Sequence, residues 1–512
     1  MTIFVQDWVK YHAETTPDNM AMIDLASQRK YTYGQMHERV ARTAGFLTES
    51  GIKRGDRVAF LTLNTTDVME LVFGCFRIGA ICLALNFRLT PPELAYILND
   101  SECSMVLVDT PFAPLADATK PLTKVAHWIG TDGVGGESEF ETGLAGAAPI
   151  YHMIDQDIED QCLLMYSSGT TGRPKGVIIT HAMLDFANSS AVRTGNVSPY
   201  YSALTNMPLF HIAGLSVTSL PTIWVGGTCV IMRMFDPDAT LKALDNADMN
   251  IATIFMVPAA YNALKAHPDV DKIDVSRIQT ALCGAETVPE ALVKWWLDKG
   301  VCIQEGYGMT ETCAVGCMLR KGDIPRKIGS TGKSLIHSQI QVTDDNGQPC
   351  APNETGELWF KGAAVTPGYW RNPEANKEAF VNGWFKSGDI GRKDAEGFIY
   401  IEDRLKDMYI SGGENVYPAE IEGLLYELPN IVEASVIGVA DTRWGETGCV
   451  IAVFKEGQAM ELDAILSHLA GRLAKYKLPT HLIVMDELPR GGTGKVLKFE
   501  LRKSVPDLLD LT

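Results

Sequence analysis

The residues best suited to chemistry in this sequence lie in a loop between two short apolar segments. The loop runs from Tyr166 to Val177 and reads Tyr-Ser-Ser-Gly-Thr-Thr-Gly-Arg-Pro-Lys-Gly-Val. Glycine lets the backbone approach a ligand closely, successive N–H groups can form an anion-binding concavity, and hydroxyl groups add donors. Arg173 and Lys175 supply positive charge. The pattern indicates a polyphosphate-binding loop, although a flexible surface loop is the alternative for this composition.

This loop is not a Walker motif, which requires Gly, four residues and then Gly-Lys-Ser/Thr. The segment Gly332-Lys333-Ser334 comes nearest, but Lys327 stands where the first glycine would be needed. A phosphate-binding loop of another kind is therefore expected.

Later stretches add further groups that suit nucleotide chemistry. Tyr307-Gly308-Met309-Thr310-Glu311 combines an aromatic face, a hydroxyl donor and a carboxylate, and Mg²⁺ prefers oxygen ligands of this kind. Two later stretches with glycine contain Asp389, a carboxylate that could accept hydrogen bonds from hydroxyl groups, and Lys495, a lone cation to which its residue type alone assigns no role. Each stretch could also be purely structural.

The overall composition limits the class of protein. The chain has 512 residues, a formal net charge of −18 and a pI near 5.0, so a nucleic-acid-binding surface is not expected. Eleven cysteines without a CxxC pair make a zinc site unlikely and favour reduced thiols in a cytoplasm. The start lacks a signal-peptide pattern, and the apolar stretch from Ile78 to Leu85 is too short to span a bilayer.

Strand-like and helix-like segments alternate along the first 310 residues, which predicts an α/β fold with doubly wound, mostly parallel sheets. Residues 130–148 are rich in Gly, Ala and Glu, and we interpret them as a surface excursion without chemistry. After about residue 320, short β-like runs with turns between them predict a small barrel. Ligands in such folds bind at the carboxyl ends of strands.

The last hundred residues predict a small α+β domain. Its helices are expected at about 418–428 and from Leu462 to Ala474, with strands from Ala434 to Val439, Val450 to Phe454 and Leu482 to Met485. The expected organisation is a large domain at 1–402, a hinge at 403–407 and a mobile C-terminal lid domain at 408–512.

Taken in chain order, the motifs resemble those of the adenylate-forming superfamily, which contains acyl- and aryl-CoA synthetases, luciferases and the adenylation domains of peptide synthetases. The matching stretches are 166–177, 307–311, 384–389, 403–406, 411–422 and 489–495, so the resemblance spans essentially the whole chain. Two places depart from the family pattern. Glu286 stands where Pro or Ala is frequent and receives no role, and Gly491-Gly492 replaces Ser, Asn or Lys, which predicts a more flexible terminal loop.

The resemblance implies a role for each motif residue. Those expected to bind ATP or CoA are Ser167, Ser168, Gly169, Thr170, Thr171, Gly172, Lys175, Gly284, Ala285, Glu305, Gly306, Tyr307, Asp389, Arg404, Lys406, Gly412 and Gly413. Among them Asp389 would bind the ribose, Lys406 would be the hinge pivot, and Gly412-Gly413 would line the tunnel for the pantetheine arm. The residues expected to take part in catalysis are Lys495, Thr310, Glu311 and His211, and Glu311 would also bind Mg²⁺.

The resemblance also implies a two-step reaction with ATP, Mg²⁺ and coenzyme A. A carboxylate would attack the α-phosphorus of ATP to give an acyl-adenylate and pyrophosphate, and the CoA thiol would then displace AMP. Lys495 would act in the first step and the Gly412-Gly413 face in the second, after the lid domain rotates. The segment Phe255 to Tyr261 lacks the acid that would bind an amino-acid amine, and the chain ends soon after Lys495. CoA is therefore the expected acceptor.

The acid itself is left open by the sequence. The expected pocket residues are mostly apolar or small, which suits an uncharged tail: His211, Ala213, Gly214, Phe255, Val257, Gly284, Gly308 and Val315. A medium- or long-chain fatty acid is the leading expectation, and an aryl or phenylpropenoic acid of the feruloyl or coumaroyl type is the alternative. A catalytically silent homologue that binds nucleotide or acyl-CoA is the alternative of another class. No membrane span and no nucleic acid are expected, and a homodimer is common among such relatives.

Overall fold

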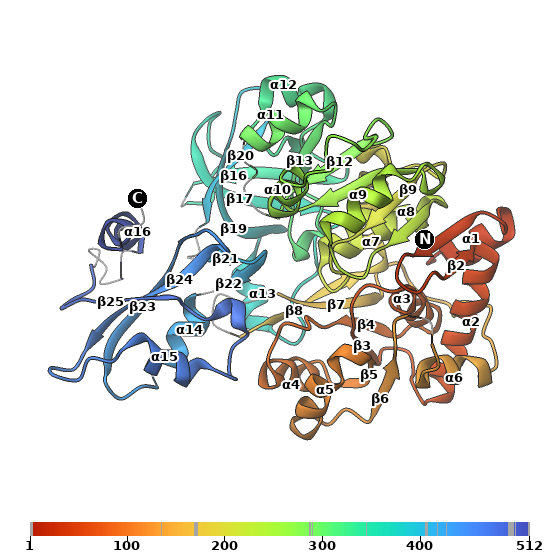
Figure 1. Cartoon of the computed structure of the whole chain (residues 1–512), viewed down its shortest axis with the longest axis horizontal. Helices are drawn as coiled ribbons and strands as arrows, with labels where there is room; N and C mark the ends of the chain where they lie inside the picture. The colour runs from red at the N-terminus through yellow and green to blue at the C-terminus, as the bar shows by residue number, and fades with distance from the viewer. Residues whose placement is uncertain are drawn as a thin grey trace. The chain divides into compact units, whose positions relative to one another are not determined.

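A computed structural model describes residues 4–509 with short gaps at 135, 168–172, 286–287, 289, 345, 405–407, 417, 426, 490–495 and 497. The described chain divides into two compact units. The first contains residues 1–87, 98–166 and 176–402, and the second contains 88–97, 167–175 and 403–512. Figure 1 follows the chain from red at the N-terminus to blue at the C-terminus.

A six-stranded sheet forms near the N-terminal part of the described chain. Its order is β6 (His127–Thr131), β5 (Cys103–Asp109), β3 (Arg57–Leu61), β4 (Ile81–Ala84), β7 (Gln161–Ser167) and β8 (Lys175–Thr180). The pairs from β6 to β7 are parallel. Parallel strands are buried on both faces, and accordingly all four residues of β4 are buried.

A second sheet has nine strands among the described residues. Its order is β15 (Lys333–Ser334), β14 (Cys317–Met318), β13 (Ile303–Tyr307), β12 (Thr280–Cys283), β11 (Ile251–Met256), β9 (Ser202–Thr205), β10 (Thr228–Ile231), β1 (Met20–Asp24) and β2 (Lys30–Thr32). The strands from β13 through β12, β11, β9 and β10 to β1 are parallel to one another. Their carboxyl ends therefore lie along one edge of the sheet.

Helices connect these strands, as expected for an α/β fold. In chain order they are α1 (Trp8–Thr15), α2 (Tyr33–Glu49), α3 (Thr66–Ile78), α4 (Pro91–Asp100), α5 (Ala113–Thr119), α6 (Glu139–Gly146), α7 (His181–Gly195), α8 (Leu220–Val225), α9 (Pro237–Asp245), α10 (Pro258–Lys265), α11 (Glu290–Asp298) and α12 (Ile324–Lys327). All residues of α3 are buried, its N-cap Thr65 accepts from the N–H of Asp67, and Gly79 ends it with a φ of 69°. Positive φ costs glycine little, so this helix has a defined end.

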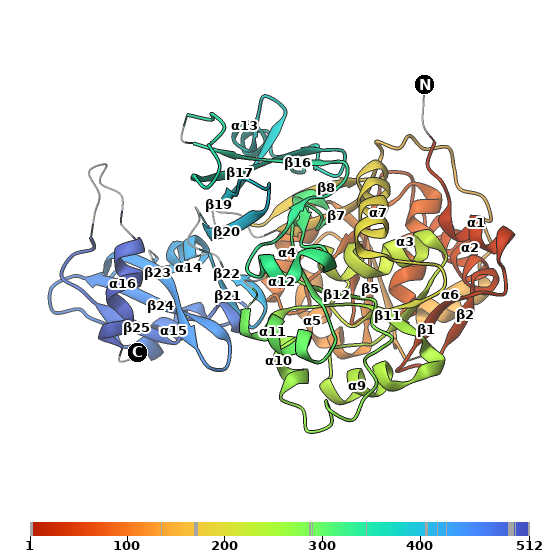
Figure 2. The same cartoon turned by 90° about the horizontal axis from the view of Figure 1, so that it is seen from above.

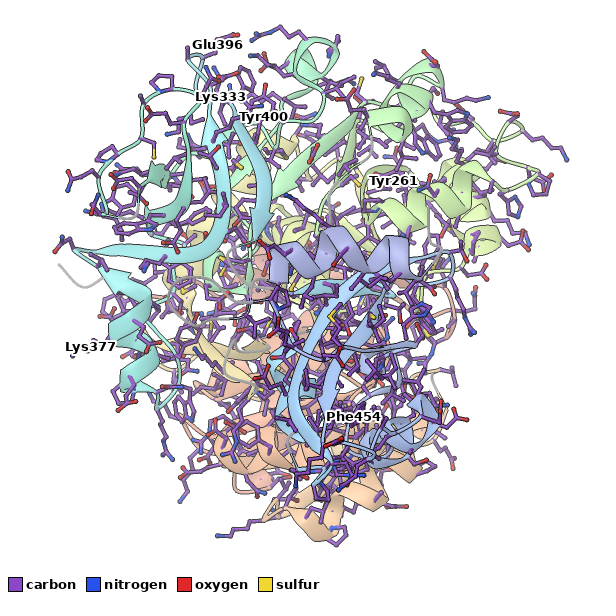
Figure 3. All side chains as sticks on the ribbon, turned by 90° about the vertical axis from the view of Figure 1, so that its left-hand side faces the viewer. Tyr261, Lys333, Lys377, Glu396, Tyr400 and Phe454 are labelled. Carbon is purple, nitrogen blue, oxygen red and sulfur yellow. The ribbon has the colours of Figure 1, made fainter. Side chains whose placement is uncertain are left out.

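The strands after residue 335 form a five-stranded, half-barrel sheet in the described chain. These strands are β16 (Ser338–Thr343), β17 (Thr355–Gly362), β18 (Phe380–Val381), β19 (Trp384–Lys393) and β20 (Ile399–Arg404), with α13 (Pro373–Ala379) before β18. At one end, the ammonium groups of Lys327 and Lys333 lie 4.6 and 4.4 Å from the ring centre of Phe398. Figure 3 shows Lys333, Glu396 and Tyr400 gathered in this region. The prediction of an α/β fold with a small barrel is confirmed.

The larger part of the second unit is a sheet with helices on both faces. The elements are β21 (Tyr409–Ser411), β22 (Glu414–Val416), α14 (Pro418–Leu425), β23 (Ile431–Asp441), β24 (Gly445–Phe454), α15 (Leu462–Leu469), β25 (His481–Val484) and α16 (Lys498–Leu508). Val436 of β23 packs in a core with α14 and α15, whereas Ile437 packs with Leu501 of α16. Successive strand residues point to opposite faces, so the sheet separates two small cores. Figure 2 shows these helices beside β23 and β24.

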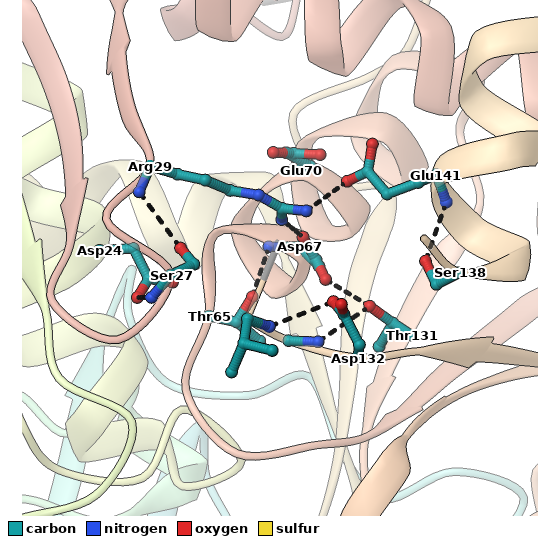
Figure 4. Close-up of polar contacts among 12 residues, drawn as sticks. Asp24, Ser27, Arg29, Thr65, Asp67, Glu70, Thr131, Asp132, Ser138 and Glu141 are labelled. Carbon is teal, nitrogen blue, oxygen red and sulfur yellow. Dashed lines mark hydrogen bonds and ion pairs between the residues drawn. The ribbon is translucent and has the colours of Figure 1, made fainter. Parts of the chain in front are cut away.

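The structure corrects the sequence analysis on residues 130–148. They are not merely a surface excursion, because they contain α6, on which Phe140 and Leu144 are buried. Glu141 of this helix accepts from Arg29 at 2.8 Å and from Arg39 at 2.6 and 2.7 Å. Figure 4 shows Arg29 between Glu141 and Asp67 of α3. The Gly- and Ala-rich composition concealed a helix that closes a network of buried charges.

The C-terminal helices are shorter than expected. The second was expected to continue to Ala474 but ends at Leu469, because Ala470 leaves the helix with a ψ of 135° and Gly471 follows with a φ of 73°. The first ends at Leu425 rather than near 428. In the described residues, no helix is both long and apolar enough to cross a membrane.

Candidate active site

Four neighbouring parallel strands bring predicted site residues to one edge of the nine-stranded sheet. His211 follows β9, Val257 follows β11, Gly284 follows β12, and Tyr307 ends β13. Because β9, β11, β12 and β13 are parallel neighbours, their carboxyl ends share that edge. This edge is where open α/β sheets bind ligands.

The turn after β12 requires a glycine. A Cβ on Gly284 would lie 2.6 Å from the carbonyl oxygen of Gly306, so only glycine lets these two backbones come so close. The next residue, Ala285, is exposed and has a φ of 71°, an uncommon conformation for a residue with a side chain. Glu286 lies outside the described residues. The turn thus places an exposed backbone segment beside β13.

Strand β13 contains a buried carboxyl group two residues before Tyr307. Glu305 is 6 % exposed, and burial raises the pKa of its carboxyl to about 7. Its backbone carbonyl accepts from the N–H of Leu319 at 2.8 Å. Gly306, between Glu305 and Tyr307, pairs with Met318 of β14. This arrangement fixes Tyr307 at the end of the strand.

The loop after β13 folds back on itself and holds Glu311. Gly308 has no room for a Cβ, which would lie 2.4 Å from the carbonyl group of Ala314. Thr310 begins a short 3₁₀ turn that ends at Thr312, and Cys313 and Ala314 follow it with φ values of 49° and 62°. The Glu311 carboxylate is buried and accepts a hydrogen bond from the hydroxyl of Tyr369 at 2.9 Å.

A bulge in the half-barrel sheet positions Asp389. The pairing of β17 with β19 shifts register between Glu357 and Trp359, opposite the segment that contains Gly388, which has a φ of 76°. The N–H of Asp389 donates to Ser387 Oγ at 3.0 Å. The hydroxyl of Tyr307 donates to Asp389 Oδ2 at 2.5 Å. The structure therefore joins two of the predicted nucleotide-binding residues directly.

His211 lies at the start of an irregular helix. Its ring is 4.4 Å from that of Phe210, and its carbonyl oxygen accepts from the N–H of Leu215. The following turn, Gly214–Ser219, is a π-helix. A Cβ on Gly214 would lie 2.1 Å from the carbonyl oxygen of Pro208, so this close approach requires glycine. Short π-helical turns occur frequently at functional sites.

Both described ends of the expected phosphate-binding loop, Ser167 and residues 173–175, lie in the second unit. Ser167 ends β7 and Lys175 begins β8. The guanidinium of Arg173 lies 5.8 Å from the ring centre of Tyr96, whose hydroxyl donates to the carbonyl oxygen of Pro174 at 3.4 Å. These contacts fix the end of the loop that contains the cations.

The same unit presents Gly412 and Gly413 in a two-residue hairpin turn. Strands β21 and β22 pair through Ser411 and Glu414, and both glycines have positive φ, of 60° and 80°. This turn geometry matches the twist of the two strands but is strained for residues with side chains. A Cβ on Gly412 would meet the Trp444 ring at 2.8 Å, whereas the surroundings of Gly413 are open.

Several expected site residues lie outside the described residues, namely Ser168, Gly169, Thr170, Thr171, Gly172, Lys406 and Lys495. The backbone of Arg404 ends β20. Their roles stay predictions.

Tyr369 is a site residue that sequence reasoning missed. It contacts Glu311 across 58 residues of sequence, and the N–H of Thr366 adds a hydrogen bond of 2.7 Å to the Glu311 carbonyl oxygen. The segment Thr366-Pro367-Gly368-Tyr369-Trp370 offers one signal, an aromatic pair after a Pro-Gly turn. That signal does not identify the carboxylate that the tyrosine contacts.

Glu311 fits the requirements of a magnesium ion that binds together with a nucleotide. Such an ion is held by one or two carboxylates while phosphate oxygens and water complete its shell. Among the described residues, no group of three or more His, Cys, Asp or Glu side chains is placed to hold a metal ion by itself. The single buried carboxylate of Glu311 is consistent with a site in which the protein and the nucleotide together supply the ligands of the ion.

Comparison with known proteins agrees with this arrangement. Residues 9–370 match the model of the AMP-binding enzyme family, and residues 420–495 match its C-terminal domain. The chain is 39 % identical to a feruloyl-CoA synthase of Amycolatopsis sp. over 92 % of this chain and 93 % of that protein. It is 36 % identical to a long-chain-fatty-acid–CoA ligase of Mycobacterium tuberculosis over 97 % of both chains.

A solved structure shows the same fold. A double mutant of the o-succinylbenzoate CoA synthetase of Bacillus subtilis, bound to a product analogue, superimposes with a TM-score of 0.87 at 30 % identity, and the match covers 98 % of both chains. The chain therefore belongs to the AMP-binding enzyme family, whose members share the adenylate-forming fold. Within that family it is an AMP-forming acid–CoA ligase.

Proposed function

We propose that this protein joins a carboxylic acid with an uncharged tail to coenzyme A at the expense of ATP, through an acyl-adenylate. AMP-forming acid–CoA ligases use ATP, Mg²⁺ and CoA. The observation that best supports the proposal is the contact of Tyr307 with Asp389, beside the loop that holds Glu311. These groups adjoin the carboxyl edge of a parallel sheet, where a nucleotide is expected to bind.

Each group has a proposed part in binding ATP. Asp389 accepts from the ribose hydroxyls and Tyr307 lies against the adenine, next to the backbone of Gly284, Ala285 and Gly306. Ser167, Lys175 and the residues between them hold the phosphates, and Thr310 donates to the α-phosphate. Bound with ATP at Glu311, Mg²⁺ would offset the negative charge of the phosphate oxygens.

The two half-reactions use different groups of the second unit in our proposal. Lys495 stabilises the attacking carboxylate and the charge on the α-phosphate while pyrophosphate leaves. The Gly412-Gly413 hairpin then lets the pantetheine arm pass close to the backbone, and the thiol forms a bond to the acyl carbon as AMP leaves. Arg404 and the hinge at Lys406 connect the two steps. Positioning and electrostatic stabilisation account for most of the acceleration in such reactions.

Two classes of acid are proposed as substrates. Among the expected pocket residues, Phe255 and Val315 are buried and apolar and Gly214 is small, which supports a medium- or long-chain fatty acid. A phenylpropenoic acid is supported by the 39 % identity to a feruloyl-CoA synthase. We also propose a cytoplasmic location, supported by eleven free cysteines.

A substrate panel tests the proposal. Pyrophosphate release from ATP would be measured with acetate, butyrate, octanoate, palmitate, benzoate and ferulate, with and without CoA. We expect acid-dependent release with one preferred class and AMP formation that depends on CoA. Absence of release with every acid, while calorimetry detects ATP binding, would instead indicate a homologue that only binds nucleotide.

The Lys495→Ala variant tests the division between the half-reactions. We expect it to lose adenylate formation and to retain thioester formation from supplied acyl-adenylate. Equal loss of both activities would contradict the assignment of Lys495 to the first step.

A further inference from the structure

A buried lysine joins two distant segments within the second unit. Lys477 lies in the short turn Lys475–Lys477, and its side chain is only 4 % exposed. Its ammonium group is 2.5 Å from Glu93 Oε1 of α4 and 3.0 Å from Glu420 Oε1 of α14. One cation therefore bridges two carboxylates that are more than 300 residues apart in the sequence.

Glu93 is held in place at the first turn of α4. The backbone N–H of Thr90 donates to Glu93 Oε2 at 2.7 Å, which is half of a capping box. The Thr90 hydroxyl lies 2.7 Å from the same carboxylate oxygen and 3.1 Å from the carbonyl oxygen of Arg472. Both oxygens of the Glu93 carboxylate therefore have a partner, Lys477 at Oε1 and Thr90 at Oε2.

A second ion pair connects the same segment to the glycine hairpin. Arg88 pairs with Glu414, whose side chain is 4 % exposed and which directly follows Gly413. Glu414 also forms the closing pair of the β21–β22 hairpin with Ser411. We call Arg88, Thr90, Glu93, Glu414, Glu420 and Lys477 the Lys477 clamp.

The clamp buries two carboxylates beside one ammonium group. We therefore expect a single substitution in it to disrupt the contacts among these groups. Burial and the nearby Glu93 raise the pKa of Glu420 to about 7, although Lys477 opposes that rise. The two carboxylates conversely raise the pKa of Lys477 against the effect of burial. Removing the lysine would leave two buried carboxylates facing each other, and loss of one partner from a buried ion pair is strongly destabilising.

We propose that the Lys477 clamp positions the Gly412-Gly413 hairpin for the thioester-forming half-reaction. The inference rests on the proposed function, in which that hairpin accommodates the pantetheine arm. The clamp fixes the hairpin through Glu414 and α14 through Glu420, so the backbone that approaches CoA is held before the thiol arrives. Such preorganisation favours a reaction in which a bound group must be placed accurately. Lys477 and Glu93 are thus positioning residues that act through the hairpin.

Separate assays of the two half-reactions test the role of the clamp. We expect Lys477→Met to slow thioester formation from supplied acyl-adenylate at least tenfold and to change acid-dependent ATP–pyrophosphate exchange less than threefold. Lys477→Arg should restore most of the loss. Lys475→Met is the matched control, because Lys475 is exposed in the same turn, and it should leave both rates unchanged. An equal decrease of both half-reactions, or no decrease in thioester formation, would overturn the proposal.

Hydrogen–deuterium exchange tests the clamp itself without any activity. We expect Lys477→Met, and the milder Glu93→Gln if the first variant folds poorly, to accelerate exchange in segments 88–97 and 409–416 but not in α9. Unchanged exchange in both segments would overturn the clamp. A different outcome is a wild-type protein in which both segments exchange slowly but which activates no acid. That result would refute the proposed function and, with it, the role of the clamp in thioester formation.

Discussion

Two groups of carboxylates in the first unit differ in their partners. In the N-terminal network, Asp67, Glu70 and Glu141 contact the guanidinium groups of Arg29 and Arg39. At the candidate active site, Glu311 and Asp389 accept hydrogen bonds from the hydroxyls of Tyr369 and Tyr307. The first network joins arginine and carboxylate side chains from four segments, whereas each carboxylate of the second region accepts a hydrogen bond from a phenol hydroxyl.

This difference in partners suggests different roles, stability for the N-terminal network and catalysis for the candidate active site. Carboxylates that contact guanidinium groups are held in fixed geometry by charge-assisted hydrogen bonds. A carboxylate that accepts from a phenol hydroxyl can exchange that hydrogen bond for a metal ion or a ribose hydroxyl. We therefore expect substitutions in the network to change folding and substitutions at the site to change turnover.

The largest expected effect is on stability, from Arg39→Met. Arg39 contacts both Glu70 and Glu141, and its loss leaves the fully buried Glu70 without the cation it contacts, which should cost about 3–5 kcal/mol of unfolding free energy. Urea unfolding would measure it. Arg42→Met on the same helix is the control, because the half-exposed Arg42–Glu38 pair should contribute less than about 1 kcal/mol. Equal costs for the two variants would contradict the structural role of the network.

The next effect is on catalysis, from Glu311→Gln. If Glu311 binds the metal ion, acid-dependent pyrophosphate release should fall about 100- to 1,000-fold, the range seen when one electrostatic contact to a transition state is removed. The unfolding midpoint should change little. The exposed Glu290→Gln serves as control. A fall in stability that matches the fall in rate would place Glu311 with the structural network instead.

A pH experiment sharpens the comparison through Glu70. Burial and the nearby Asp67 raise the pKa of Glu70 from 4.5 to about 7, against the effect of Arg39. The folded protein therefore holds this proton up to about pH 7, and the unfolded chain loses it near 4.5. The contribution of Glu70 to the free energy of unfolding is therefore fully present below pH 4.5 and is lost as the pH rises to about 7. At 1.36 kcal/mol per pKa unit, the loss amounts to about 3 kcal/mol.

The Glu70→Gln variant isolates that contribution. Because glutamine does not titrate, the variant should gain stability relative to the wild type between pH 5.5 and pH 8. Urea unfolding of both proteins at the two pH values measures the difference. A constant difference between them would show that Glu70 ionises at its ordinary pKa.

The smallest expected effect follows from Tyr369→Phe. This change removes one hydrogen bond to Glu311 and keeps the ring, which corresponds to about 1 kcal/mol or roughly a fivefold higher KM for MgATP. Steady-state kinetics with varied MgATP would measure it. Tyr151→Phe removes an exposed hydroxyl bonded to Glu38 and should have no such effect.

The fold could be predicted from local patterns to a large extent. Apolar strands such as Arg57–Leu61 and Ile251–Met256 alternate with amphipathic helices, and this alternation determines a parallel sheet. Helix α6 escaped prediction because its sequence, Glu-Phe-Glu-Thr-Gly-Leu-Ala-Gly, contains two glycines and has a weak apolar face. The early end of α15 depends on the conformation at Gly471, which composition does not reveal.

The candidate site could be predicted only in part. The positions of Gly284, Tyr307 and Glu311 follow from strand ends and family resemblance. The contact of Tyr307 with Asp389 depends on a register shift between β17 and β19 and joins residues 82 apart, so no local pattern contains it. Tyr369 was missed for the same reason, since its partner is determined by tertiary packing. The assignments of Lys495 and the phosphate loop stay predictions.

The π-helical turn Gly214–Ser219 has a consequence for how relatives of this chain can diverge. Such a turn holds one more residue than an α-helical turn, so deletion of a single codon would restore the regular ladder. Residues of an α-helix follow one another at about 100°, and the deletion would therefore rotate the side chains between His211 and α8 by about that angle. One mutational event could thus present a different set of side chains after β9 while the strands stay unchanged. We expect insertions and deletions at this turn to accompany changes of acid preference more often than substitutions in the sheet.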